Sequence, residues 1–181
     1  MKPFIVSMDS DLEEVGGTRM LKGTLDETSY HVGVDEYKTP EGVAYDLILT
    51  NTGEGILLSG LAKCTAQTRC ARCLDPVELD IAGEVEGYYL LEPAEKVEGY
   101  EEDEFEVIDD EGNFDISGPL EAALVFDTPY VTLCKDDCKG LCPRCGKNLN
   151  EGPCDCPPDD GIDDMNPFAV LKNLDLGQND N

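Results

Sequence analysis

Six of the nine cysteines lie within one short segment, Leu133 to Cys156, which reads LCKDDCKGLCPRCGKNLNEGPCDC. Its CPRCG run has the pattern of a metal-binding knuckle, a tight turn that directs two sulfurs toward one centre. A second pair follows after a loop that is short enough to limit the entropic cost of closure. We therefore predict one structural Zn²⁺ site, whose four thiolate ligands are Cys142, Cys145, Cys154 and Cys156.

Four further cysteines leave the ligand set open. Cys134 and Cys138 stand just before the knuckle, and Cys70 and Cys73 form a separate CxxC turn. The upstream pair either joins the first centre, completes a second four-cysteine site with the CxxC turn, or binds no metal. A thiol-redox pair is the alternative reading of Cys70 and Cys73, but such a pair needs a helix N-terminus and this turn runs into a strand pattern. Cys64 is expected to be a small buried residue.

The cysteine count also bears on the compartment. An odd number of cysteines is awkward for a disulfide framework, whereas metal thiolates suit a reducing cytosol. The sequence shows neither a secretory signal pattern nor an apolar run of membrane-spanning length. We expect a cytoplasmic protein with no membrane partner.

The chain of 181 residues is strongly acidic, with 40 Asp and Glu against 13 Lys and Arg and a formal net charge of −27. Such a chain repels phosphate unless its few cations gather on one surface, so generic nucleic-acid binding is disfavoured. Basic proteins, ribosomal proteins among them, are the natural partners, although acidity also serves solubility alone. The cysteine segment balances four acidic residues with four cations, and a candidate RNA-binding surface there would consist of Lys135, Lys139, Arg144 and Lys147.

The hydrophobic pattern predicts an α+β fold that is mainly antiparallel β, a curved sheet or partly closed barrel with a covering helix and the small zinc module. Alternation over Val77–Leu91 indicates a long strand, or a hairpin broken near Gly83 or Gly87, with one buried and one acidic face. Residues 43–50 and 56–58 flank a turn and form a hairpin, and residues 29–34 form another strand. Residues 9–27 carry no clear pattern.

One helix is expected between Pro119 and Asp127, capped by Ser117 or Gly118, ended by Pro129, and packed through Leu120, Ala123 and Leu124. A second short helix is expected at residues 166–174. The predicted organisation is an antiparallel β body over 1–91 that includes the Cys70–Cys73 turn, an acidic, partly mobile connection over 92–114, a helix and exit segment over 115–133 packed on the body, the zinc module over 134–156, and a linker, short helix and polar tail over 157–181.

These motifs together resemble the YceD family, the large ribosomal RNA subunit accumulation proteins of bacteria and plastids. The resemblance rests on the CxRCLxP run of residues 70–76, on Asp115-Ile with Pro119, Glu121, Leu124 and Pro129, on the run CKGLCPRCGKNLNEGPCDC, and on residues 166–174. It implies a non-enzymatic role in the synthesis, processing or stability of 23S ribosomal RNA, with a large-subunit ribosomal protein or that RNA as partner. Some family members keep the CxRC turn but lack the later cysteines, so the resemblance does not make the turn a ligand.

Catalytic chemistry has little support in the residues. His31 is the only histidine, and it is expected to be a packed or surface residue. An all-cysteine zinc shell is closed to substrate, and no P-loop, GxGxxG or GxSxG motif occurs. We therefore expect no enzyme and no small-molecule substrate.

Overall fold

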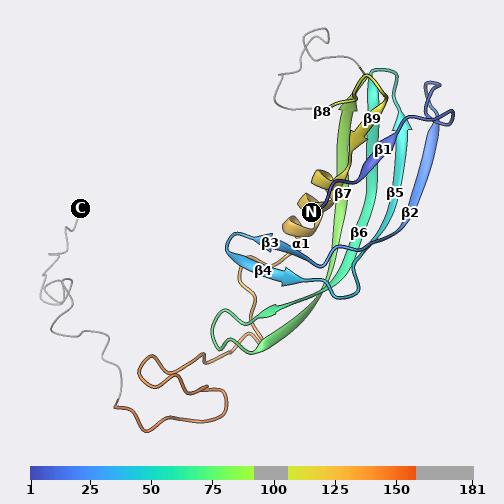
Figure 1. Ribbon diagram of the computed structural model, residues 1–181. Helices are drawn as coiled ribbons and strands as arrows, with labels where there is room; N and C mark the ends of the chain where they lie inside the picture. The colour runs from blue at the N-terminus through green and yellow to red at the C-terminus, as the bar shows by residue number, and fades with distance from the viewer. Residues whose placement is uncertain (92–105, 158–181) are drawn as a thin grey trace, which may run out of the picture.

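The computed structural model describes residues 1–91 and 106–157. Its main body is an open antiparallel sheet built on two long neighbouring strands, β6 (Gly55–Arg69) and β7 (Pro76–Leu90) (Figure 1). β5 (Val43–Asn51) lies on the other side of β6, and β2 (Thr18–Leu25) pairs with β5 at the far edge. The predicted antiparallel fold is confirmed, and the sheet does not close into a barrel.

The long strand expected over residues 77–91 is present as the single uninterrupted β7. Its odd-numbered side chains turn inward, with Ile81, Val85 and Tyr89 buried, while the glutamates and aspartates between them are exposed. The hairpin of β5 and β6 is likewise confirmed. Period-two alternation identified these strands because one face of the sheet is covered and the other meets water.

Two small additions complete the sheet. A hairpin of β3 (Ser29–Val32) and β4 (Asp35–Lys38) joins the end of β6 through the pairing of Lys38 with Gln67. β8 (Glu106–Val107) runs parallel to the end of β7, and β1 (Ile5–Ser7) pairs separately with β9 (Asn113–Asp115).

The end of the acidic connection predicted over 92–114 is ordered, because it contains β8 and most of β9. Its acidic composition had predicted partial mobility. Ile108 is buried after β8, and its backbone N–H donates to the carbonyl of Leu90 at 2.9 Å. The rest of the expected connection, residues 92–105, and the expected helix at 166–174 lie outside the described residues.

The helix α1 (Ser117–Asp127) covers one face of the sheet beside β7 (Figure 1). Leu120, Ala123 and Leu124 are buried as expected, and the chain becomes extended at Thr128, before Pro129. The expected cap is wrong, because Ser117 is already helical and no side chain of the residue before it caps the first turn. The Asp115 carboxylate instead accepts the backbone N–H of Ser117 at 2.9 Å.

Close packing of α1 on β7 depends on a glycine. A Cβ at Gly83 would lie 2.1 Å from the carbonyl oxygen of Ala123, so no larger residue fits without moving the helix. Beyond the helix, residues 128–133 lead to the cysteine-rich segment at the turn between β6 and β7 (Figure 1). There the backbone N–H of Ala71 donates to the carbonyl of Thr132 at 2.9 Å. The fold thus brings the two parts of the chain that carry the cysteines together.

Candidate metal centres

The structure gathers eight of the nine cysteines into two groups of four. One group is Cys70, Cys73, Cys134 and Cys138, and the other is Cys142, Cys145, Cys154 and Cys156. Within each group all sulfurs lie within 4.8 Å of one another. Cys64, the ninth cysteine, is buried in the sheet as expected. We call the first group the hinge quartet, because it joins the sheet to the cysteine segment, and the second the loop quartet.

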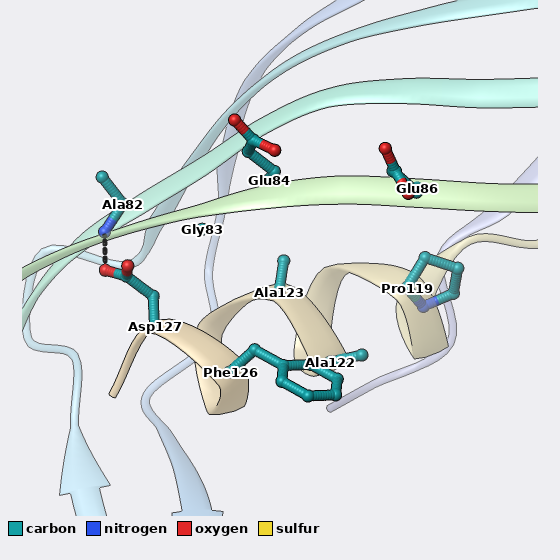
Figure 2. A pocket seen from close by; sticks show the side chains of 9 residues that line it. All are labelled: Ala82, Gly83, Glu84, Glu86, Pro119, Ala122, Ala123, Phe126 and Asp127. Atoms are coloured by element: carbon teal, nitrogen blue, oxygen red, sulfur yellow. Dashed lines mark hydrogen bonds between the residues drawn. The ribbon is translucent and has the colours of Figure 1, made fainter. Parts of the chain in front are cut away.

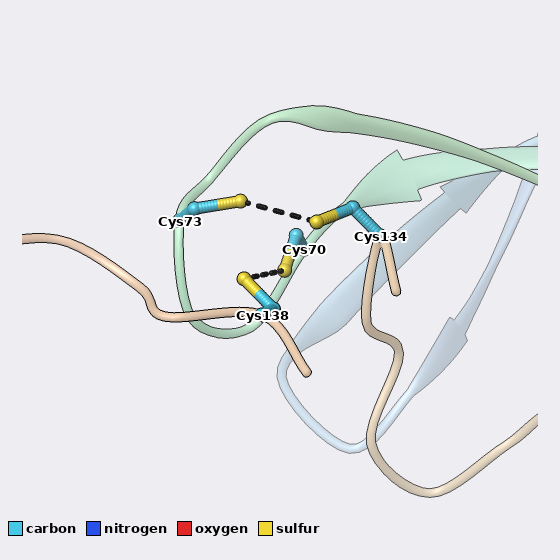
Figure 3. Close-up of side chains that lie close together, drawn as sticks. All are labelled: Cys70, Cys73, Cys134 and Cys138. Atoms are coloured by element: carbon cyan, nitrogen blue, oxygen red, sulfur yellow. Dashed lines mark hydrogen bonds between the residues drawn. The ribbon is translucent and has the colours of Figure 1, made fainter. Parts of the chain in front are cut away.

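The sulfur spacing fits one metal ion in each quartet. Four sulfurs at about 2.3 Å from a tetrahedral zinc ion stand about 3.8 Å apart. In the hinge quartet, the Sγ atoms of Cys70 and Cys138 lie 3.7 Å apart and those of Cys73 and Cys134 lie 3.5 Å apart (Figure 3). In the loop quartet, the sulfurs of Cys142 and Cys154 are 3.4 Å apart. None of the cysteines is paired in a disulfide.

The two CxxC turns have the same backbone geometry. In each, the amide of the first cysteine donates to the carbonyl five residues later: Cys70 to Asp75, and Cys142 to Lys147, both at 2.8 Å. In each, the residue after the second cysteine donates back to the first cysteine's carbonyl and has a left-handed backbone, with φ 64° at Leu74 and 72° at Gly146. Gly146 identified the second turn as a knuckle in the sequence. The first turn has Leu74 at that position, and its knuckle geometry was not predicted.

Backbone amides near the first sulfur of each knuckle stabilise a thiolate there. At Cys142, the N–H groups of Cys145 and Arg144 lower the thiol pKa to about 6. Burial by itself raises the pKa of Cys70, but the N–H groups of Cys73 and Arg72 outweigh it and lower the pKa to about 6.

Two other thiols, Cys156 and Cys73, hold their protons more tightly, because neighbouring sulfurs and burial disfavour their thiolate forms. The thiols of Cys145 and Cys142, together with burial, raise the pKa of Cys156 to about 12. Burial and neighbouring acidic groups raise the pKa of Cys73 as well. Four thiolates so close together need a compensating cation, which a divalent metal supplies.

Polar side chains connect the two quartets. Asn150, in the loop quartet's connecting segment, donates to the Sγ of Cys138 at 3.3 Å, and Asn148 donates to the Asp75 carboxylate at 2.9 Å. Arg72 donates from its guanidinium to the carbonyl of Cys138 at 3.0 Å. These hydrogen bonds around the quartets were not predicted. The only hint in the sequence is that arginine occupies the same place in both knuckles, as Arg72 and Arg144.

The four cations of the candidate RNA surface are exposed, but two of them make contacts within their own segment. The Lys147 ammonium donates to the carbonyl of Pro153 at 2.7 Å, inside the loop quartet's own segment. The Lys135 ammonium lies 3.8 Å from the Asp137 carboxylate. Lys139 and Arg144 are exposed. His31 is exposed on β3, far in sequence from both quartets.

Comparison with known proteins decides the family. Residues 58–175 match the family model described as large ribosomal RNA subunit accumulation protein YceD, and this match includes both quartets. The chain belongs to the YceD family. Membership suggests a role in accumulation of large-subunit ribosomal RNA, and the family's description names no catalysed reaction.

The curated relatives are mycobacterial. Uncharacterized proteins of Mycobacterium bovis and Mycobacterium tuberculosis are each 31% identical over 124 residues, which is 67% of this chain and 59% of the relative. An uncharacterized protein of Mycobacterium leprae is 29% identical over 105 residues, 58% of this chain and 48% of the relative. The alignments thus cover about half of the length of these relatives. No solved structure matches the chain. Within the described residues, no helix is both long and apolar enough to cross a membrane.

Proposed function

We propose that this YceD protein is a cytoplasmic, non-enzymatic ribosome-biogenesis factor that promotes 23S ribosomal RNA accumulation by binding a basic large-subunit ribosomal protein. The observation that carries the proposal is the family match of residues 58–175 on a chain whose net charge is −27. An acidic surface attracts a basic ribosomal protein and shields its positive charge until RNA takes the place of the acidic surface.

Zinc would have a structural role in this function. Each quartet offers four thiolates and no open coordination position, which is the ligand set of a structural rather than a catalytic zinc site. Each filled site would carry two net negative charges, because four thiolates outnumber the charge of one Zn²⁺ ion. Metal binding would therefore add to the acidity that attracts a basic partner.

Affinity purification of the full chain, with identification of both proteins and RNA, tests the proposal. We expect large-subunit ribosomal proteins to be recovered, to remain after ribonuclease treatment, and to dissociate as salt is raised. Recovery of neither large-subunit proteins nor 23S RNA would sink the proposed function.

Direct RNA binding is a second candidate, favoured by the exposed Lys139 and Arg144 beside the loop quartet. The contacts of Lys147 and Lys135 within their own segment weigh against it. If RNA is bound there, replacing all four cations with glutamine reduces RNA retention and the steepness of its salt dependence. Unchanged retention would leave the protein-binding role.

A thiol-redox activity of Cys70 and Cys73 is the third candidate, and the lowered pKa of Cys70 is the observation in its favour. The same thiolate is what a metal site requires, so its pKa does not separate the two roles. Stoichiometric zinc that protects all four hinge-quartet thiols from alkylation would exclude a redox pair. Zinc-free protein that cycles between dithiol and disulfide would support one.

A further inference from the structure

The outer edge of β7 is an open strand edge beside a groove. No strand among the described residues pairs with this edge before Tyr89, where β8 begins its short contact. The groove lies between the edge and α1, has a volume of about 620 Å³, and is lined by Gly83, Glu84, Glu86, Pro119, Ala122 and Phe126, among others (Figure 2).

One hydrogen bond shows which backbone groups face this edge. The N–H of Ala82 donates outward to the carboxylate of Asp127 at the end of α1, at 2.8 Å. Because alternate residues of a strand direct their N–H and C=O groups to the same edge, Glu84 and Glu86 present theirs on the same side. The groove therefore contains backbone donors and acceptors in the spacing that an added strand requires.

The two sides of the groove differ in chemistry. On the α1 side, Phe126 is 92% exposed and its ring lies beside Ala122, while Pro119 lines the groove nearer the start of the helix. On the opposite face of β7, the side chains of Glu84 and Glu86 point away from the helix (Figure 2). A strand laid against this edge would place alternate side chains over an apolar surface and over a row of carboxylates.

We propose that this groove binds an extended segment of a basic protein, which adds a strand to β7. The inference rests on the proposed function, in which the partner is basic. The segment would alternate small apolar side chains, which contact Phe126, with lysine or arginine side chains, which meet Glu84 and Glu86. A second copy of the chain fits poorly, because edge-to-edge pairing would bring two rows of glutamate together. Nucleic acid would meet the same carboxylates.

The test uses a synthetic peptide of about ten residues that alternates lysine and valine, with blocked ends, against a peptide of the same composition in which the lysines and valines form two blocks. Calorimetry with the full-length protein should show tighter binding of the alternating peptide by about tenfold. Hydrogen exchange at the amides of Glu84 and Glu86 should slow when that peptide binds.

Two variants separate strand addition from charge attraction. Glu84→Pro removes an outward N–H while the β6 pairing remains, since proline is tolerated where the N–H faces away from the sheet, and it should weaken peptide binding about tenfold or more. Glu84→Gln with Glu86→Gln should weaken binding, whereas Glu13→Gln with Glu14→Gln, an equal charge change on an exposed loop, should not. Circular dichroism confirms that each variant is folded.

Three outcomes would overturn the inference. They are equal affinity for the two peptides, an equal loss of peptide affinity in the two double glutamine variants, or amide hydrogen exchange at Glu84 and Glu86 that does not change when the peptide binds. The proposed function fails separately. If Glu84→Pro captures large-subunit ribosomal proteins as well as the unaltered chain does, the partner binds elsewhere and only the groove assignment is wrong. If the unaltered chain captures none, the function itself is wrong, whatever the peptide does.

Discussion

At the scale of single residues, the two knuckles differ most at the position after their second cysteine. Leu74 holds a left-handed φ of 64° with its side chain 56% exposed, whereas Gly146 holds the same conformation at 72° without a side chain. A residue with a Cβ pays about 1 kcal/mol or more for this conformation, and glycine does not. The hinge quartet therefore contains a backbone strain that the loop quartet lacks.

Exchanging the residue types should shift the two knuckles in opposite directions. Gly146→Ala should weaken metal retention by the loop quartet by about 1 kcal/mol, from the backbone alone, because an added Cβ meets nothing within 4 Å. Leu74→Gly should strengthen the hinge quartet by up to a similar amount. Competition with a coloured chelator measures both. If Gly146→Ala retains metal as tightly as the unaltered protein, the left-handed backbone at this position does not determine metal affinity.

Asp115 connects three segments through one carboxylate. Its Oδ1 accepts the backbone N–H groups of Phe4 and Ser117, each at 2.9 Å. Burial alone would raise the pKa of Asp115, but these hydrogen bonds, Ser117 first, outweigh it and hold the pKa below its usual range. The charged form is thus favoured by folding.

A folded-state pKa below the unfolded value gives stability that is present above the unfolded pKa of about 4 and is lost as the pH falls through the folded pKa. Asp115→Asn should therefore lower the free energy of unfolding near neutral pH, by about 1 kcal/mol as for a lost helix-terminal contact. The difference in unfolding free energy between the variant and the unaltered protein should become smaller in acid. Urea denaturation of both proteins at several pH values measures this difference. A difference that persists below pH of about 2 would refute its electrostatic origin.

At the scale of elements, two buried tyrosines join the β3–β4 hairpin to the segment between α1 and the cysteines. The hydroxyl of Tyr30 bonds to Thr128 at 2.7 Å, that of Tyr37 bonds to Thr132 at 2.9 Å, and the two rings stack with centroids 5.4 Å apart. Thr132 in turn accepts the amide of Ala71 in the first knuckle. The hairpin thus supports the hinge quartet indirectly.

The two tyrosines should respond differently to loss of the hydroxyl. Tyr30→Phe leaves Thr128 with its hydrogen bond to the Leu124 carbonyl, so the free energy of unfolding should fall by only about 1 kcal/mol. Tyr37→Phe leaves the buried Thr132 hydroxyl without its only side-chain partner among the described residues, so the cost should be larger, about 1–3 kcal/mol. Thermal denaturation compares the two variants. The reverse order would show that Thr132 finds another partner.

The sequence predicted those elements whose signal is local. Strict alternation identified β7, and turn residues identified the β5–β6 hairpin. β2 was missed because Gly16-Gly17 precedes it and its inner side chains are only half buried. β8 and β9 have two and three residues, too few for a period to show inside an acidic run. The pairing of Cys134 and Cys138 with Cys70 and Cys73 depends on how α1 returns the chain to the β6–β7 turn, which no local pattern encodes.

At the scale of the whole molecule, the quartets hold different things together. The hinge quartet joins residues 70–73, in the turn between β6 and β7, to residues 134–138, whereas the loop quartet closes on residues 142–156 alone. The sheet has its own core, so neither quartet is needed to bury Leu47, Leu58 or Ile81. Metal loss should therefore release the cysteine segment and leave the sheet folded.

Single substitutions should separate the two roles. Cys154→Ser should lower the zinc content, measured by native mass spectrometry, from about two ions to one and speed hydrogen exchange within residues 142–156. Cys138→Ser should cause the same loss of metal and speed exchange at residues 70–74 and 132–138, because the connection to the sheet is lost. Cys64→Ser is the matched control that retains both ions.

Strand signal in circular dichroism should persist in both quartet variants, and its loss in Cys154→Ser would contradict an independent sheet. Equal exchange patterns in the two variants would instead show that the hydrogen bonds from Asn150 to Cys138 and from Asn148 to Asp75 make the quartets one cooperative unit.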